Sequence, residues 1–236
     1  MLELNKIYQG DCLQIIKNID DKSIDLIVTD PPYEYISKSP YGGGFMSNEN
    51  KKHLVAIRDS FGMSFNPKDF LQSIQRIMKK FNLYIYTNKS LLTEYINFAE
   101  DNKYKWEIIV WLKTNPVPIF NGHYLIDKEY ILYIKEAGAT FNSNLGYDNY
   151  FTYFFHPIGR VGKVTNHPTE KSIEPIKRFI RISSNENDLI LDPFCGSGTT
   201  LVATKRLNRN YIGIELEPKY VEIANKRISE LPQQLF

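Results

Sequence analysis

The chain has 236 residues, and its 29 basic and 27 acidic side chains give a formal net charge of +2. A chain of this length forms one or two domains with a sizeable core, and its near-neutral charge excludes a protein that coats nucleic acid by charge alone. Its 42% hydrophobic and 24% charged residues are ordinary for a globular protein. No apolar run reaches the ~20 residues of a membrane helix, and the first residues carry no signal-peptide pattern. Cys12 and Cys195 are too few for a disulfide framework, so we expect a cytoplasmic protein.

Apolar residues recur with periods that alternate between strands and helices along the chain. We predict strands at Ile7–Tyr8, Ile24–Thr29, Asn82–Thr87, Trp106–Leu112, Glu129–Lys135, Asp188–Asp192 and Asn210–Glu215. We predict helices after the capping residue Asp11 and at Pro67–Lys80, Ser90–Glu100, Glu170–Ile182, Thr199–Leu207 and Pro218–Leu231. Strands that alternate with helices predict a doubly wound α/β fold around a mostly parallel sheet.

Two stretches break this alternation. Glu34–Gly62 contains three consecutive glycines among polar residues and is typical of a long flexible loop. Ala139–Asn166 is rich in Asn, Gly, Tyr and Phe without a clear period, so we expect an insertion that lies on the sheet rather than in it.

The segment that follows the strand at residues 188–192 is rich in glycine. Gly196, Ser197 and Gly198 precede a helix, and glycines at that place let the backbone approach a ligand closely. Glu215 ends the next strand, where a carboxylate can accept hydrogen bonds from ribose hydroxyls. The third glycine of a dinucleotide fingerprint is replaced by Leu201, so the pattern favours a nucleoside ligand over NAD. The alternative is a tight strand–helix turn with no ligand.

A second pattern, Asp30-Pro31-Pro32-Tyr33, ends the strand that begins at Ile24. Prolines have no N–H donor, so this turn presents the Asp30 carboxylate and backbone carbonyls as acceptors for a substrate NH2 group. The ring of Tyr33 can stack on a base. The alternative is that the prolines only end the strand and the tyrosine packs in the core.

These two motifs together resemble the DNA amino-methyltransferases that use S-adenosylmethionine, and their order resembles the circularly permuted β group of that family. The resemblance extends to YQGDCLQII at residues 8–16 and to HPTEKS at residues 167–172. In the latter, Ser172 replaces the usual proline. The resemblance implies a Rossmann-like, doubly wound sheet of seven strands. Residues 1–138 and 167–236 would form the catalytic domain. Residues 139–166 would form a small target-recognition insertion, and residues 34–62 the flexible loop.

The resemblance also implies a cofactor site for S-adenosylmethionine. Asp11 and Cys12 would meet the adenine, Glu215 the ribose, and Lys171 the methionine carboxylate, with Asp192 at the ammonium group. The full set of expected cofactor residues is Asp11, Cys12, Asp30, Thr169, Lys171, Asp192, Pro193, Phe194, Cys195, Gly196, Ser197, Gly198, Thr199, Thr200 and Glu215. Asp11 could also be only a helix cap, and Lys171 only a solvated lysine.

The expected chemistry is methyl transfer to an adenine that is flipped out of the duplex. Tyr33 would stack on the base, and Asp30 and the Pro31 carbonyl would accept hydrogen bonds from its N6 amino group. Positioning and electrostatics would carry catalysis. The cysteines would not act as nucleophiles, and no metal-ligand spacing is present. Alternatives are an N4-cytosine enzyme, an RNA or protein amine methyltransferase, a nucleotide-binding module with a decayed site, and a dehydrogenase.

The expected partner is double-stranded DNA. Between Tyr153 and Arg181 the chain carries six basic and two acidic residues, just after a run of aromatic residues. Tyr41, Arg160 and Lys163 are candidate DNA contacts, although the aromatic residues could instead form a small core or a dimer contact. A homodimer and a cognate restriction endonuclease remain open. The tail LPQQLF, Leu231–Phe236, is similar to peptides that dock on the replication sliding clamp, but a frayed end explains it as well.

Overall fold

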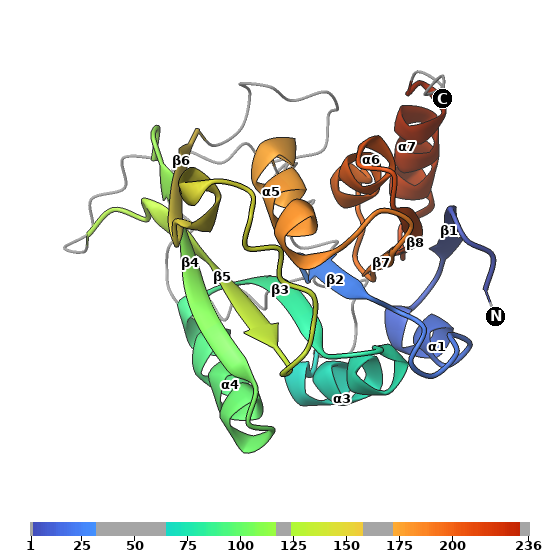
Figure 1. Cartoon of the computed structure of the whole chain (residues 1–236). Coiled ribbons are helices and arrows are strands. Elements are labelled where there is room, and N and C mark those ends of the chain that lie inside the picture. Colours follow the sequence, from blue (N-terminus) through green and yellow to red (C-terminus); the bar gives the residue numbers. More distant parts are fainter. Residues whose placement is uncertain (1, 32–64, 117–123, 158–171, 232–236) are drawn as a thin grey trace, which may run out of the picture.

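A single eight-stranded sheet runs through the protein (Figure 1). The structure is a computed structural model, and it describes residues 2–31, 65–116, 124–157 and 172–231. The strands are β1 (Lys6–Gln9), β2 (Leu26–Thr29), β3 (Asn82–Thr87), β4 (Lys105–Lys113), β5 (Lys128–Lys135), β6 (Tyr153–His156), β7 (Leu189–Asp192) and β8 (Asn210–Glu215). Their order across the sheet is β1-β8-β7-β2-β3-β5-β4-β6. Among the strands in the described ranges only β5 runs antiparallel to its neighbours, which confirms the mostly parallel sheet.

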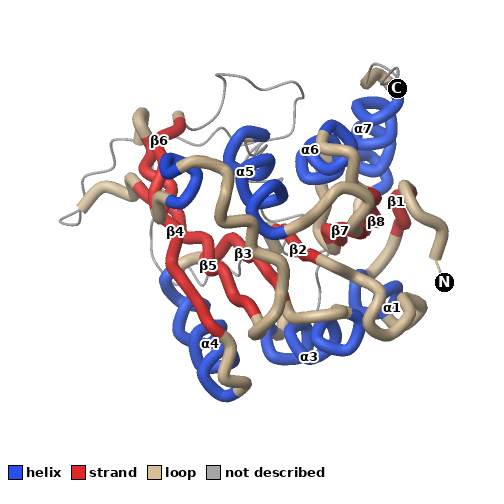
Figure 2. Tube along the Cα trace, viewed as in Figure 1, coloured by secondary structure: helices blue, strands red, loops and turns tan. Residues whose placement is uncertain are grey.

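Helices cover both faces of the sheet, as Figure 2 shows. One face carries α1 (Cys12–Ile16), α3 (Pro67–Ile77) and α4 (Lys89–Asp101), and the other carries α5 (Ile173–Ser183), α6 (Thr199–Arg206) and α7 (Pro218–Ser229). Strand β2 illustrates why: it is fully buried, with Ile27 in the core under α3 and Leu26 and Val28 in the core under α5. Alternate side chains of a strand point to opposite faces, so a strand that is buried at every position needs helices on both sides. The doubly wound α/β class is confirmed.

The helices begin where side chains cap them. Asp11 accepts a hydrogen bond from the N–H of Gln14, 3.0 Å away, and Asn66 and Asn88 cap α3 and α4 in the same manner. Helix α3 ends at Ile77, three residues earlier than predicted, because Met78 is already extended and forms a parallel bridge with Ile24. None of the helices in the described ranges is long and apolar enough to cross a bilayer.

The sheet has eight strands rather than the seven expected, because part of the predicted insertion joins it. Strand β6 pairs in parallel with the last residues of β4, from Val110↔Tyr153 to Lys113↔His156. Its side chains alternate in burial, with Tyr153 and Phe155 exposed and Phe154 half-buried. Because aromatic residues occupy both faces, the sequence shows no apolar–polar period, and the prediction that the whole insertion lies on the sheet was wrong.

Candidate active site

The two sequence motifs lie side by side at the carboxyl edge of the sheet. Strands β2 and β7 are parallel neighbours, with Leu26 opposite Ile190. At their ends the Thr29 hydroxyl donates a hydrogen bond to Asp192, with 2.8 Å between Oγ1 and Oδ1. Asp30 follows Thr29 directly. The structure therefore confirms that motifs some 160 residues apart in sequence become neighbours at the place where doubly wound sheets bind ligands.

Asp192 is the most deeply buried acid at this edge, with only 3% of its surface exposed. Its Oδ1 also accepts the N–H of Phe194 at 3.2 Å, and the Thr200 side chain donates to the same carboxylate. The pKa of Asp192 is raised to about 7, mainly by burial and to a smaller extent by the nearby charge of Asp30, against the opposing effect of these hydrogen bonds. A buried carboxylate of this kind is poised to accept a cationic ligand group in place of a proton.

The glycine turn approaches its neighbours very closely. Gly196 and Gly198 have φ angles of 49° and 82°, in the left-handed region that favours glycine. The N–H of Gly198 donates to the Cys195 carbonyl at 2.7 Å, and α6 begins at the next residue. A Cβ atom on Gly198 would lie 2.8 Å from that of Ala224 on α7. Both the backbone conformation and the packing therefore require glycine at position 198.

Arg227 holds the same turn from α7. Its Nη1 donates to the Ser197 carbonyl at 2.7 Å, to Ser197 Oγ at 3.0 Å and to Thr199 Oγ1 at 3.2 Å. Residues three apart share one side of a helix, so Ala224 and Arg227 together form the back wall of the turn. Sequence reasoning missed this arginine, because a basic residue in a C-terminal helix is usually solvated. The only sequence signal is that Arg227 follows Ala224, a small residue on a helix rich in charged residues, by three positions.

Glu215 lies at the end of β8, beside the turn. One carboxylate oxygen accepts the N–H of Gly196 at 2.8 Å and the other accepts the N–H of Glu217 at 2.9 Å. Burial raises the pKa of Glu215, and the backbone hydrogen bonds oppose that rise. Each carboxylate oxygen can accept more than one hydrogen bond, so this fixed carboxylate retains capacity for hydroxyl groups of a ligand.

The first strand brings Asp11 to the same edge. The N–H of Gly10 donates to the Glu215 carbonyl at 2.9 Å, and Asp11 then caps α1. Cys12 is buried, and burial raises the pKa of its thiol to about 12. The pKa of Cys195 is likewise raised by burial. Both thiols are therefore held in the protonated form, which is unsuitable for a nucleophile.

Phe194 is fixed by two other rings. Its centroid lies 5.6 Å from that of Phe65 and 5.5 Å from that of Phe70. Phe70 is fully buried on α3, so this cluster anchors the turn to the helix layer opposite α6. The sequence pattern did not single out Phe65 or Phe70 as part of the site.

The carboxylates at this edge suit a cationic ligand with a ribose. Among the described residues, Asp192 and Glu215 receive hydrogen bonds only from uncharged N–H and O–H groups. The described residues contain no group of three or more His, Cys, Asp or Glu side chains that could hold a metal ion. These features fit S-adenosylmethionine, which carries a ribose and positive charge.

Several predicted site residues lie outside the described residues: Pro32, Tyr33, Tyr41, Arg160, Lys163, Thr169 and Lys171. The expected flexible loop at residues 34–62 and the tail after Leu231 lie outside as well. The described residues that meet at the carboxyl edge are Asp11, Cys12, Asp30, Pro31, Asp192, Pro193, Phe194, Cys195, Gly196, Ser197, Gly198, Thr199, Thr200 and Glu215.

A parallel sheet with an acidic carboxyl edge and a glycine turn defines a nucleoside-binding α/β protein. The family model described as DNA methylase, N6_N4_Mtase, matches residues 24–226. The type II methyltransferase M2.MboI of Moraxella bovis is 32% identical over 95% of this chain and 88% of its own length. The chain belongs to the DNA methylase family.

Solved structures agree with this membership. The structure of M1.HpyAVI in complex with S-adenosylmethionine has a TM-score of 0.67, with 28% identity over 94% of this chain and 98% of its own. The cytosine-N4-specific methyltransferase PvuII has a TM-score of 0.71 but only 16% identity, over 100% of this chain and 89% of its own, and so shows the fold alone. The predicted class of DNA methyltransferase and its cofactor, S-adenosylmethionine, are confirmed.

The close contact between Gly198 and Ala224 yields a stability prediction. Gly198→Ala should lower the free energy of unfolding by about 2–4 kcal/mol, from overpacking and from left-handed strain together. The double variant Gly198→Ala/Ala224→Gly should recover the overpacking part and retain the strain. Urea unfolding of both variants and of Ala224→Gly alone separates the two contributions. A Gly198→Ala protein as stable as the parent would contradict the packing described above.

Proposed function

We propose that the protein is a site-specific DNA methyltransferase that transfers a methyl group from S-adenosylmethionine to the N6 amino group of an adenine flipped out of duplex DNA. The observation that carries the proposal is the place of Asp30. It follows Thr29, whose hydroxyl binds Asp192 beside the glycine turn, so an acceptor for the target amine stands next to the cofactor site.

The cofactor site would be built from three segments of this chain, which lie at the ends of β1, β7 and β8. Glu215 would bind the ribose hydroxyls, Asp11 the adenine end, and Asp192 the cationic methionine end. S-adenosylmethionine, when bound, supplies an activated methyl group on a sulfonium. The glycine turn, held by Arg227, keeps the wall of this site fixed, which reduces the ordering that binding requires.

The target amine would be held by Asp30 and Pro31. Pro31 is buried and has no N–H, so its carbonyl and the Asp30 carboxylate can act at this turn only as acceptors. Two acceptors on the amino group draw its lone pair out of the ring system and aim it at the methyl group. Tyr33 would stack on the base, and closure of the site would exclude water.

Adenine is proposed as the target because the sequence has Asp at the first position of Asp30-Pro31-Pro32-Tyr33. The second candidate is N4-cytosine methylation, which requires the same acceptors for an exocyclic amine. The family model covers both chemistries by name, and the likeness to PvuII shows that the fold serves cytosine as well. The fold alone therefore does not choose the base.

Residues 139–166 are proposed to contact the DNA. In support, this part of the chain exposes large rings: Tyr147 is 81% exposed and Phe155 66%. Exposed rings of this kind can stack on or prop bases. We propose that the protein acts in the cytoplasm on chromosomal or phage DNA. A homodimer, a cognate endonuclease and sliding-clamp docking through the tail stay predictions.

The modified base can be identified directly. Duplex DNA incubated with the protein and methyl-labelled S-adenosylmethionine, then digested to nucleosides, should yield label in N6-methyladenine. Label in N4-methylcytosine would change the assigned target base and leave the proposed DNA methyltransferase activity as it is. Label in RNA or protein, with none in DNA, would overturn the proposal.

Removal of the acceptor should separate catalysis from cofactor binding. Asp30→Ala should lower kcat by about 100-fold or more, because an interaction formed with the reacting amine is lost, while the Kd for S-adenosylmethionine changes by no more than a few fold. Calorimetry and single-turnover methylation measure the two effects. The control Asp101→Ala, at the exposed end of α4, should leave both unchanged. Undiminished turnover in Asp30→Ala would refute the role of the acceptor.

The raised pKa of Asp192 predicts a pH dependence of cofactor binding. If the ionised carboxylate binds the cationic end of S-adenosylmethionine, binding below about pH 7 must expel the proton that burial retains. Affinity should therefore rise as the pH increases from about 6 to 8, with proton release on binding. Calorimetry in buffers of different ionisation enthalpy measures that release. In Asp192→Asn the part of the pH dependence of affinity that comes from this carboxyl group should vanish. Any pH dependence that persists then has another origin, such as the amino group of the ligand.

The stability of the cofactor-free protein should change in the opposite sense. Between about pH 4 and 7 the folded state retains a proton on Asp192 that the unfolded state has already released. The free energy of unfolding should therefore fall as the pH rises through this window, and Asp192→Asn should reduce that fall. If the free energy of unfolding changes with pH equally in the parent protein and in Asp192→Asn, Asp192 is ionised throughout this range.

A further inference from the structure

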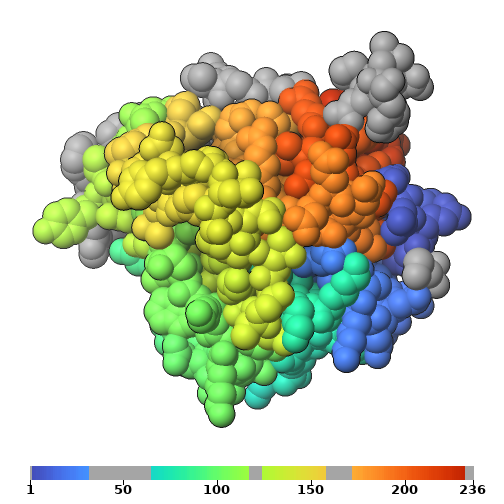
Figure 3. Space-filling view, in the orientation of Figure 1, coloured from blue at the N-terminus to red at the C-terminus, as the bar shows by residue number. Residues whose placement is uncertain are grey.

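A second cavity lies on the α5 face of the sheet, away from the carboxyl edge. Its volume is about 250 Å³. Its floor is formed by β4 and β5, one wall by α5, and the other wall by residues 141–152 of the insertion. Figure 3 shows these residues, in yellow, lying over the green β4 and beside the orange α5.

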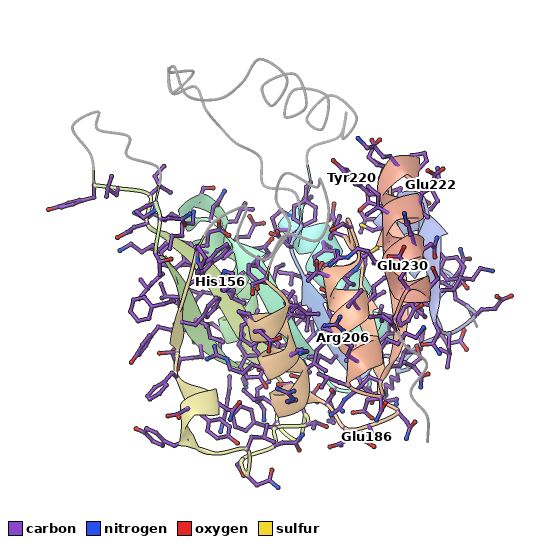
Figure 4. The ribbon with its side chains drawn as sticks, turned by 90° about the horizontal axis from the view of Figure 1, so that it is seen from above. His156, Glu186, Arg206, Tyr220, Glu222 and Glu230 are labelled. Carbon is purple, nitrogen blue, oxygen red and sulfur yellow. The ribbon has the colours of Figure 1, made fainter. Side chains whose placement is uncertain are left out.

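The floor of this cavity begins at the end of the strands opposite the active site. Lys105 and Lys135, which line it, pair with each other, and Lys135 also pairs with Asn82 at the start of β3. The six residues of β3 span about 17 Å, and the carboxyl edge lies beyond its other end. In Figure 4, Glu186, which follows α5, lies on the side of the molecule opposite Tyr220 at the start of α7. A molecule in this cavity does not occupy the cofactor or target-base site.

Arg178 enters the cavity from α5 without an acceptor. Its guanidinium carbon lies 5.5 Å from the ring centroid of Phe154 and 5.4 Å from that of Phe179. Its Nε is buried with no hydrogen-bond partner, and no described residue accepts a hydrogen bond from its other nitrogens. The guanidinium lies against both rings, and these cation–π contacts fix it without using its N–H donors. Burial lowers the pKa of Arg178, as expected where no carboxylate compensates the charge.

The other charges around the cavity are also mostly positive. Lys135 donates to the Ala139 carbonyl at 3.2 Å, and its pKa is lowered by burial and by the charge of Lys105. No described carboxylate forms an ion pair with either lysine or with Arg178. The single acid in the lining is Glu107, which accepts the N–H of Ile108 at 3.0 Å. Three cations against one acid favour an anionic ligand.

The remaining lining is aromatic and flat. The ring centroid of Phe141 lies 6.3 Å from that of Tyr133 on the floor and 5.9 Å from that of Tyr150 on the wall. The hydroxyls of Tyr84 and Tyr133 are satisfied by Ser183, at 2.9 and 3.1 Å. The ring of Tyr84 is itself stacked between those of Tyr133 and Phe179, at centroid distances of 4.2 and 4.5 Å, so the floor is closed and the aromatic residues 141, 150 and 151 of the insertion are the ones that can meet a ligand. A cavity of this size takes one ring system, with an anionic group at the guanidinium.

We propose that this cavity binds a nucleotide unit, with its base between the aromatic residues of the insertion and its phosphate on Arg178. A nucleotide combines the two features that the lining requires, a planar ring and a phosphate that accepts hydrogen bonds from a guanidinium. It could come from a free mononucleotide or from a strand of DNA. The inference goes beyond the proposed methyl transfer, because it concerns a second site and holds for either target base.

The test uses deoxyadenosine 5′-monophosphate as the probe, with S-adenosylhomocysteine saturating the active site. Calorimetry should show one additional binding event. Arg178→Met should weaken it by about tenfold or more, as expected for loss of a charge-assisted hydrogen bond. Deoxyadenosine and inorganic phosphate should each bind more weakly than the nucleotide.

Two further variants make the test independent of folding. Arg181→Met changes an exposed arginine on the same helix that does not line the cavity, and should leave binding unchanged. Glu107→Gln removes the only acid of the lining and should tighten binding. A gain in affinity cannot result from a protein that fails to fold.

Two arms distinguish the source of the nucleotide. If the source is DNA, a short single-stranded oligonucleotide should bind more tightly than the mononucleotide, and Arg178→Met but not Arg181→Met should weaken duplex binding. If the source is a free nucleotide, DNA binding should be the same in both variants. Absence of nucleotide binding, equal binding by Arg178→Met, or displacement of the nucleotide by S-adenosylhomocysteine would each overturn the proposal.

Discussion

The buried hydrogen bond between Thr29 and Asp192 connects the two halves of the proposed chemistry. It joins the ends of β2 and β7, with 2.8 Å between the side-chain oxygens. Parallel pairing of these strands fixes their register, and the hydrogen bond then fixes where Asp30 and the glycine turn leave the sheet. Because the bond is buried, its geometry does not relax into solvent. A shift of one residue in this register would exchange the faces of β2 and move the acceptor away from the cofactor site.

Helix α7 provides the second constraint. It packs against the glycine turn through Ala224, and its Arg227 binds three oxygens of Ser197 and Thr199. The same helix buries Ile228 with Ile7 of β1. The last helix therefore links the first strand to the loop that would hold the methionine end. Segments from the beginning and the end of the sequence therefore stabilise one wall of the site.

The sequence predicts most of the fold because the fold rests on short-range patterns. Helix caps, strand ends at proline, and runs of apolar residues such as Leu189–Leu191 in β7 predict the element order and its α/β class. The juxtaposition of Asp30 and Gly196 followed from the rule for carboxyl edges. The sequence pattern does not predict contacts between residues that are far apart in the chain, such as the strand pairing of β6 and the hydrogen bonds of Arg227. Strand β6 is aromatic on both faces, and Arg227 acts at a distance of about thirty residues from its partners, so neither leaves a local signal.

The insertion reaches both ends of the sheet, and this explains why its composition is so aromatic. Strand β6 pairs with the carboxyl half of β4, so one end of the insertion is anchored beside the proposed active site. Residues 141–152 fold back along the sheet, where Phe141, Tyr150 and Phe151 wall the second cavity. A small segment without a helix layer of its own can bury little aliphatic surface. Flat side chains that stack on one another and on α5 supply contact area at low entropic cost, since each has few rotatable bonds. The same stacking holds Arg178 in place, so the packing of the insertion and the positive charge of its cavity have one physical origin.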